Sequence, residues 1–158
     1  MRSDAYEVHV LLQDLDGGSP RWWRERSGAG PPRTVLELHV PPRRGAVWIA
    51  RHWACDRARE SAVPDESLPD IELLTSELVA NAIVHGPGGE VEVRFSVDSD
   101  CVRVEVSDTS AGRPQVRRPD PGTPGGQGLR LVSMLATEWG HGRRAGRTGN
   151  TVWFTLSI

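Results

Sequence analysis

Lysine is absent from this chain of 158 residues, and all 19 of its basic residues are arginine. Any contact to a phosphate group must therefore come from an arginine or from backbone N–H groups. The net charge is only −2, so overall charge does not indicate a nucleic-acid-binding protein. No apolar run approaches the roughly 20 residues of a membrane-spanning helix, and the first ten residues lack the apolar segment of a signal peptide. We expect a cytoplasmic protein with no membrane contact.

Several signatures of metal and nucleotide binding are also missing. The chain has two cysteines, Cys55 and Cys101, and no histidines clustered with them, so they make a poor zinc site, and buried free thiols are expected rather than a disulfide. No G-x-x-x-x-G-K-[ST] motif exists, and no G-x-G-x-x-G comes after a first strand. These absences exclude a P-loop nucleotide-binding protein and a Rossmann fold.

Hydrophobic periodicity predicts helices in three places and strands in up to six. The helices are expected at residues 45–61, 70–85 and 129–137, and the strands at 6–12, 34–40, 90–97, 101–107, 139–145 and 150–158. This order is typical of an α+β fold, with a mostly antiparallel sheet and helices on one face. The chain is long enough for a single domain with a substantial core.

Two segments are less regular. Residues 1–33 are expected to form an N-terminal extension, partly disordered, ahead of a domain at 34–158. Trp22 and Trp23 lie there in an arginine-rich patch, either as a docking segment for a partner or as side chains that fold back on the domain. Residues 109–127 are rich in proline and glycine, and a loop of this length inside a domain is more often functional than idle.

The most informative stretch is residues 70–85, an amphipathic helix. Glu77, Asn81 and His85 succeed one another at intervals of four, so their side chains form one row on the helix surface. On most amphipathic helices such a row is simply the solvated face. The row gains significance only in combination with residues further along the chain.

Three pieces line up in order. They are the helix segment E-L-V-A-N-A-I-V-H-G from Glu77 to Gly86, Asp108 at the end of a strand, and the glycine-rich segment 125–128 before a helix. Together they resemble the GHKL superfamily of ATP-binding domains, which includes gyrase, Hsp90, histidine kinases and MutL. The E-x-x-x-N-A-x-x-H-G form is most similar to the small bacterial anti-sigma-factor serine kinases. The resemblance covers residues 34–158.

The resemblance implies the Bergerat ATP-binding fold, a two-layer sandwich of a mixed, mostly antiparallel sheet with helices on one face, and ATP and Mg²⁺ as ligands. It gives Glu77 the role of catalytic base and Asn81 that of metal ligand, and Asp108 binds the amino group of adenine. These residue types suit the chemistry, because Mg²⁺ prefers oxygen ligands and an ionised carboxylate only accepts hydrogen bonds. For Asp108 alone, a turn after a strand would be the ordinary interpretation.

The resemblance extends to further nucleotide-binding positions. They are His85, Gly112, Gly126, Gly128, Leu129, Arg130 and Thr151. Gly112 belongs to the loop that Asp108 opens, and Gly126, Gly128 and Leu129 would supply backbone of a lid over the phosphates. Arg130 is best placed to reach the γ-phosphate, and Thr151 would lie near adenine. Without the resemblance, the glycine-rich segment is an ordinary flexible linker and Thr151 an ordinary strand residue.

The function implied is that of an anti-sigma-factor serine/threonine protein kinase. It would bind a sigma factor and phosphorylate a STAS-type anti-anti-sigma protein, and family members often form homodimers. The alternative is a nucleotide-binding regulatory module without kinase activity, because Ser110 stands where the family usually has the first glycine of its D-x-G-x-G box. A histidine-kinase fragment or a gyrase-like ATPase fits less well, since neither a phospho-accepting helix nor a transducer domain is recognisable in the sequence.

Overall fold

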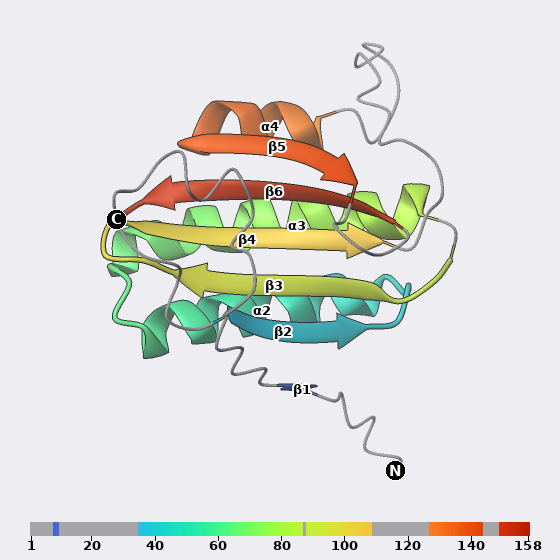
Figure 1. Cartoon of the computed structure of the whole chain (residues 1–158), viewed down its shortest axis with the longest axis horizontal. Helices are drawn as coiled ribbons and strands as arrows, with labels where there is room; N and C mark the ends of the chain where they lie inside the picture. Colours follow the sequence, from blue (N-terminus) through green and yellow to red (C-terminus); the bar gives the residue numbers. More distant parts are fainter. Residues whose placement is uncertain (1–7, 10–34, 87, 109–126, 144–148) are drawn as a thin grey trace.

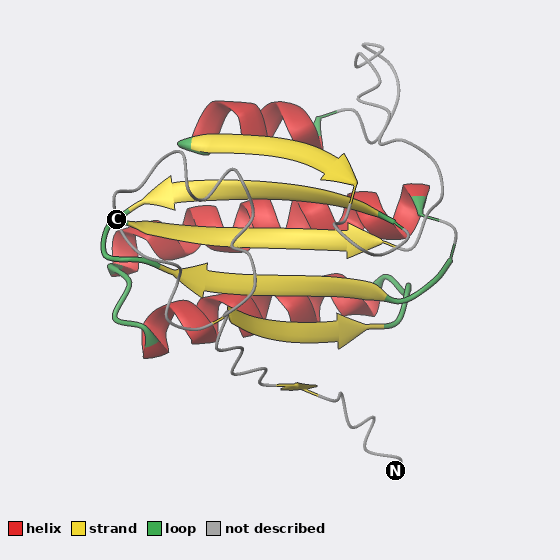
Figure 2. Cartoon of the chain, in the orientation of Figure 1, coloured by secondary structure: helices red, strands yellow, loops and turns green. Residues whose placement is uncertain are grey.

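An antiparallel sheet forms one layer of the structure and helices form the other (Figures 1 and 2). The computed structural model describes residues 8–9, 35–86, 88–108, 127–143 and 149–158. The elements are β1 (Val8–His9), β2 (Val35–Val40), α2 (Gly45–Glu60), the 3-10 helix η1 (Asp65–Ser67), α3 (Leu68–His85), β3 (Val91–Val97), β4 (Cys101–Asp108), α4 (Gly128–Leu135), β5 (Glu138–Arg143) and β6 (Asn150–Ser157). This is the α+β class expected from the sequence.

The strands have the order β1-β2-β3-β4-β6-β5 across the sheet. Every pairing among the described strands is antiparallel, so this part of the sheet contains none of the parallel pairing that a mixed sheet would have. β3 and β4 form the predicted hairpin, closed by a hydrogen bond from the Asp98 N–H to the Cys101 carbonyl (2.9 Å). Two residues of the predicted N-terminal extension, Val8 and His9, pair with β2 at the edge of the sheet.

The helices differ from their predicted bounds only at the ends. α3 begins two residues earlier than expected, directly after η1, and Pro69 lies in its first turn, where the missing N–H costs no hydrogen bond. α4 ends at Leu135, because Ala136 already has an extended backbone. Among the helices of the described ranges, none is both long and apolar enough to cross a membrane.

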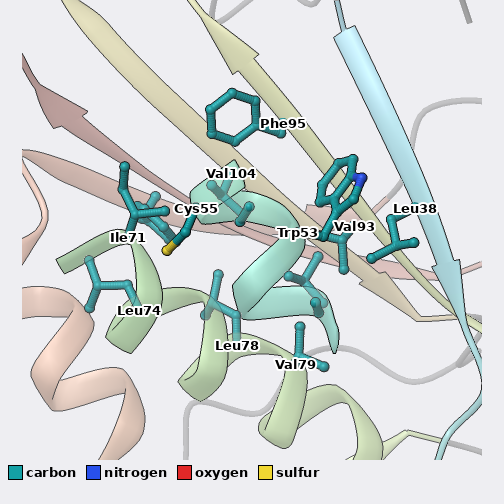
Figure 3. Packing of buried hydrophobic residues seen from close by; sticks show 14 of the residues in the cluster. Leu38, Trp53, Cys55, Ile71, Leu74, Leu78, Val79, Val93, Phe95 and Val104 are labelled. Carbon is teal, nitrogen blue, oxygen red and sulfur yellow. The ribbon is translucent and has the colours of Figure 1, made fainter. Parts of the chain in front are cut away.

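The core lies between α2, α3 and the inner face of the sheet (Figure 3). α3 contributes Ile71, Leu74 and Leu78, which share one face of the helix at 3.6-residue spacing and are at most 2 % exposed. Trp53 of α2 meets the ring of Phe95 on β3 edge to face, with centroids 6.4 Å apart. Packing on this face fixes the rotation of α3, and therefore also the direction of its row of polar side chains, which borders the packed face.

The two cysteines are free thiols, as expected, but only Cys55 is fully buried. Its Sγ lies 3.8 Å from the carbonyl oxygen of Leu68, at the start of α3. Cys101 begins β4 and is half-buried. Burial raises the pKa of both thiols above their ordinary value, so both are less reactive toward alkylating reagents than free cysteine.

The other face of the sheet is ionic rather than apolar. Arg94 lies 2.5 Å from a carboxylate oxygen of Glu37 and 2.9 Å from one of Glu92, and both carboxylates are buried. Arg103 is buried too, with its guanidinium 3.9 Å from the ring centroid of Trp153. Buried charges are tolerated only when paired, so this face is held by ion pairs and a cation–π contact. The two faces of the sheet therefore carry different chemistry.

Truncation of Leu74 tests the assigned core. The change Leu74→Ala removes a side chain that is 0 % exposed, and we expect it to lower the free energy of unfolding by about 3 kcal/mol. Its neighbour Leu73 is 37 % exposed, so Leu73→Ala is a matched control with an expected loss of about 0.5 kcal/mol or less. Urea unfolding followed by circular dichroism measures both. Equal losses would show that α3 is rotated differently.

Candidate functional site

The polar row of α3 borders the packed face of the helix, since Asn81 and His85 follow Leu74 and Leu78 by seven residues, or about two turns. Glu77 and Asn81 are half-buried, and His85 at the end of the helix is exposed. Within the described part of the chain, none of these three side chains has a hydrogen bond or an ion pair. A carboxylate and an amide oxygen one helical turn apart are therefore available to a ligand, as the spacing in the sequence predicts.

The first turn of α4 packs directly against Glu77. A Cβ atom built on Gly128 would overlap Glu77 Oε2, so the absence of a side chain at Gly128 leaves room for the Glu77 carboxylate where it lies. The carboxylate thus lies beside the N-terminus of α4, where free backbone N–H groups and the positive end of the helix dipole favour negative charge. This contact joins the start of α4 to the polar row of α3.

The C-terminal end of α3 meets the end of β4. A Cβ on Gly86 would overlap the carbonyl oxygen of Ala82 and would lie 3.6 Å from the Cβ of Asp108. Gly86 has φ −76°, so a close approach of the backbone requires glycine here, and a left-handed conformation does not. The contact places Asp108 on the face of the sheet that α3 covers.

The carboxylate of Asp108 also meets the neighbouring strand. Asp108 is directly opposite Asn150 in the β4–β6 register, and the Asn150 N–H donates to Asp108 Oδ1 at 3.4 Å. Asn150 is 4 % exposed, and Asp108 is half-buried. The end of β4, the start of β6 and the end of α3 therefore meet around this carboxylate.

Thr151 is not on the same face as Asp108. Its hydroxyl lies 2.7 Å from the hydroxyl of Ser107, which is directly opposite Thr151 in the β4–β6 register. Since successive side chains of a strand point to opposite faces, Ser107 and Thr151 face the ionic side of the sheet, and Asp108 and Asn150 face the helices. The structure does not bring Thr151 together with the other predicted site residues.

The remaining predicted residues divide into two groups. Leu129 is half-buried and packs against the core, and Arg130, one residue further into α4, is exposed. Gly112, Gly126 and Ser110 lie outside the described residues. The expected phosphate-binding backbone is thus described only from Gln127 onward, where α4 begins.

Together these groups suit a nucleotide with a bound hard cation. The carboxylate of Glu77 can accept a proton, and the side-chain oxygen of Asn81 can ligate a cation such as Mg²⁺ without adding charge. The start of α4 offers N–H groups to an anion next to them. Asp108 can accept a hydrogen bond from an amino group.

The family model of the histidine kinase-like ATPase domain matches residues 40–156. This match spans most of the chain, from the end of β2 to β6, and we conclude that the chain belongs to this family. Membership supports ATP binding and a kinase-like or ATPase activity. No curated protein matches the chain.

Asn150 is the residue of this site that the sequence analysis missed. A signal for it was present, because side chains two apart in a strand share a face. Phe154 and Val152 on β6 pair with Val104 and Val106 on β4, so counting back by two from Val152 leads to Asn150 and not to Thr151. The alternation along β6 points to Asn150 only when the register between β4 and β6 is known, and the sequence alone does not give that register.

Replacement of Gly86 tests the close backbone approach at the C-terminal end of α3. In Gly86→Ala the new Cβ overlaps the carbonyl of Ala82, so the helix end must shift, and we expect a loss of about 1–3 kcal/mol in unfolding free energy. Gly45→Ala is the matched control, because a Cβ at Gly45 meets no atom within 4 Å and alanine favours the helix. Urea unfolding of both variants measures the difference. A neutral Gly86→Ala would mean that Gly86 is not held as close to the Ala82 carbonyl as the structure shows.

Proposed function

We propose that the chain is an ATP- and Mg²⁺-dependent serine/threonine protein kinase of the anti-sigma-factor type. It binds a sigma factor and phosphorylates a serine of a STAS-type anti-anti-sigma partner, in the cytoplasm and as a homodimer. The observation that carries the proposal is the pair Glu77 and Asn81, one turn apart on α3 and without hydrogen bonds or ion pairs in the described structure, beside the start of α4. The subtype rests on the E-x-x-x-N-A-x-x-H-G pattern from Glu77 to Gly86.

In this proposal Glu77 is the catalytic base. Its carboxylate takes the proton of the partner's serine hydroxyl as the serine oxygen forms a bond to the γ-phosphorus of ATP. The bond between that phosphorus and the bridging oxygen breaks, and its electron pair leaves with ADP. The half-buried position of Glu77 limits the water that competes with the serine for this base.

Asn81 is suited to hold the metal ion. Mg²⁺ takes oxygen ligands and keeps several waters, so a single side-chain oxygen together with the phosphate oxygens of the substrate is a sufficient set. When bound, the ion would neutralise charge on the phosphates. Asn81 is neutral and therefore does not repel the negatively charged triphosphate, whereas a second carboxylate would. Asp108 binds the amino group of adenine at the other end of the site.

A second candidate function is a nucleotide-binding module without phosphoryl transfer. The contact between Glu77 and the first turn of α4 favours it, because a carboxylate beside a helix N-terminus also stabilises that helix. Under this alternative Glu77 holds α4 in place, and a regulatory partner reads the nucleotide-bound shape. The two functions predict different effects when the charge of Glu77 is removed: the kinase loses its base, and the binding module loses a contact that holds α4.

The variant Glu77→Gln distinguishes them. It keeps the shape of the side chain and removes the base, so the kinase proposal predicts that phosphate transfer to a STAS-type partner falls about 100-fold or more. ATP affinity should remain within about twofold, since the base adds little to ground-state binding. Transfer of labelled phosphate and calorimetric titration measure the two quantities. Glu66→Gln, at an exposed position of η1, is the control that should leave both unchanged.

Two outcomes would count against the kinase. Transfer at the wild-type rate in Glu77→Gln would remove the base from the mechanism. Tight ATP binding by the wild type, with no transfer to any STAS-type partner offered, would favour the binding module.

The variant Asn81→Ala tests the metal ligand separately. Without the amide oxygen, the gain in ATP affinity on adding Mg²⁺ should fall by about tenfold, or 1.4 kcal/mol, while metal-free binding stays the same. Calorimetric titrations with Mg²⁺ and with EDTA give both values. A Mg²⁺ dependence equal to that of the wild type would contradict the ligand role of Asn81.

A further inference from the structure

We infer that the arginine-rich segment of this chain, residues 21–26 with the sequence R-W-W-R-E-R, docks on the ionic face of the sheet and covers it. The segment lies between β1 and β2 and outside the described residues, whereas the face to which we assign it is made of described residues. This inference concerns a surface away from the candidate site and does not depend on the proposed kinase activity.

The ionic face is buried although the described helices lie on the other side of the sheet. In Figure 1, α2, α3 and α4 lie behind the strands, and the ionic face is turned toward the viewer. An antiparallel sheet with helices on one face commonly leaves its other face to water. Here Glu37, Glu92, Arg103 and Ser107 on that other face are at most 5 % exposed. Charged side chains of a solvated face are mostly exposed, so a further layer of chain covers these residues.

The charge of the ionic face indicates which kind of layer fits it. In the described strands, the register places four glutamates but only two arginines on this face: Glu37, Glu92, Glu105 and Glu138 against Arg94 and Arg103. Residues 21–26 contain three arginines and one glutamate. The segment and the face therefore carry opposite net charge, and opposite charges across an interface favour association.

The two tryptophans of the segment supply the apolar area that burial requires. Trp22 and Trp23 each offer about 150–250 Å² of surface, which excludes water from the ion pairs beneath it. Ion pairs from which water is excluded are screened less and attract more strongly. Arginines on both sides of the two tryptophans bring positive charge to the carboxylates at the same time.

Both ends of the connection that contains the segment lie at the edge of this face. β1 ends at His9, which is directly opposite Glu37 in the β1–β2 register, and β2 begins at Val35. The 25 residues from 10 to 34 must therefore leave this edge and return to it, and Trp22 stands at their midpoint. Half of such a connection reaches roughly 40 Å when extended, whereas six strands span only about 24 Å.

A cysteine placed on the ionic face measures whether the segment covers it. Ser107→Cys puts a thiol of similar size at a position of β4 that is buried on this face. The alkylation rate of this thiol by iodoacetamide is measured in the full chain by mass spectrometry of the separated peptides. Native Cys55, which is buried on the helix face, reports in the same sample on opening of the core.

Removal of the tryptophans should expose the introduced thiol selectively. With the segment intact, we expect the thiol to react at least tenfold more slowly than free cysteine. Trp22→Ala and Trp23→Ala together should raise its rate about tenfold, while the rate of Cys55 stays the same. Trp48→Ala, at a 58 % exposed position of α2, is the matched control and should change neither rate.

Thermal unfolding checks that each variant is folded. Arg24→Glu replaces the double tryptophan variant if that one does not fold, because reversal of one charge opposes docking without removing apolar area. In this variant too, the introduced thiol should react faster and Cys55 should not.

Four results would overturn the inference. The introduced thiol could react as fast as free cysteine with the segment intact, which would mean that the face is open. Its protection could survive the loss of both tryptophans, which would assign the cover to another part of the chain. Protection lost on dilution would assign it to a second copy. Equal acceleration of the introduced thiol and Cys55 would mean that the tryptophans stabilise the whole fold and do not cover this face.

Discussion

The packing of α3 on the sheet is the constraint on which the site depends. Ile71, Leu74 and Leu78 bury one face of the helix, and this packing sets the direction of Glu77 and Asn81, whose row borders that face. The amphipathic pattern thus has two consequences, since the residues that stabilise the fold also orient the residues to which we assign the proposed chemistry. A helix rotated by one residue would lose both.

The sheet provides the second half of the site through the alternation of its strands. One face carries the apolar core and, at its end, Asp108 and Asn150. The other face carries buried ion pairs, among them Arg94 with Glu37. Because both faces are filled, a change of register by one residue would place charges in the core and apolar side chains among the ion pairs. The end of the sheet at which we propose that the base binds is therefore fixed by the stability of the whole sheet.

The sequence predicted the helices and strands, and it predicted the polar row of the candidate site but not the contacts between distant segments around it. Helix and strand periods are local, so α3 and the β3–β4 hairpin could be predicted from single stretches. The row of Glu77 and Asn81 is local as well. The pairing of Asp108 with Asn150 joins residues 42 apart, and no local pattern gives the register between two strands. The close contacts at Gly86 and Gly128 also depend on tertiary packing.

The most direct test of the central claim is to locate bound Mg²⁺–ATP by NMR. Amide resonances of the ¹⁵N-labelled chain are assigned and monitored during titration with the nucleotide. We expect the largest shifts in the second half of α3, at the end of β4 and start of β6, and in the first turn of α4. Shifts confined to the ionic face of the sheet, around Arg94 and Trp153, or no shifts at millimolar ATP, would contradict the claim.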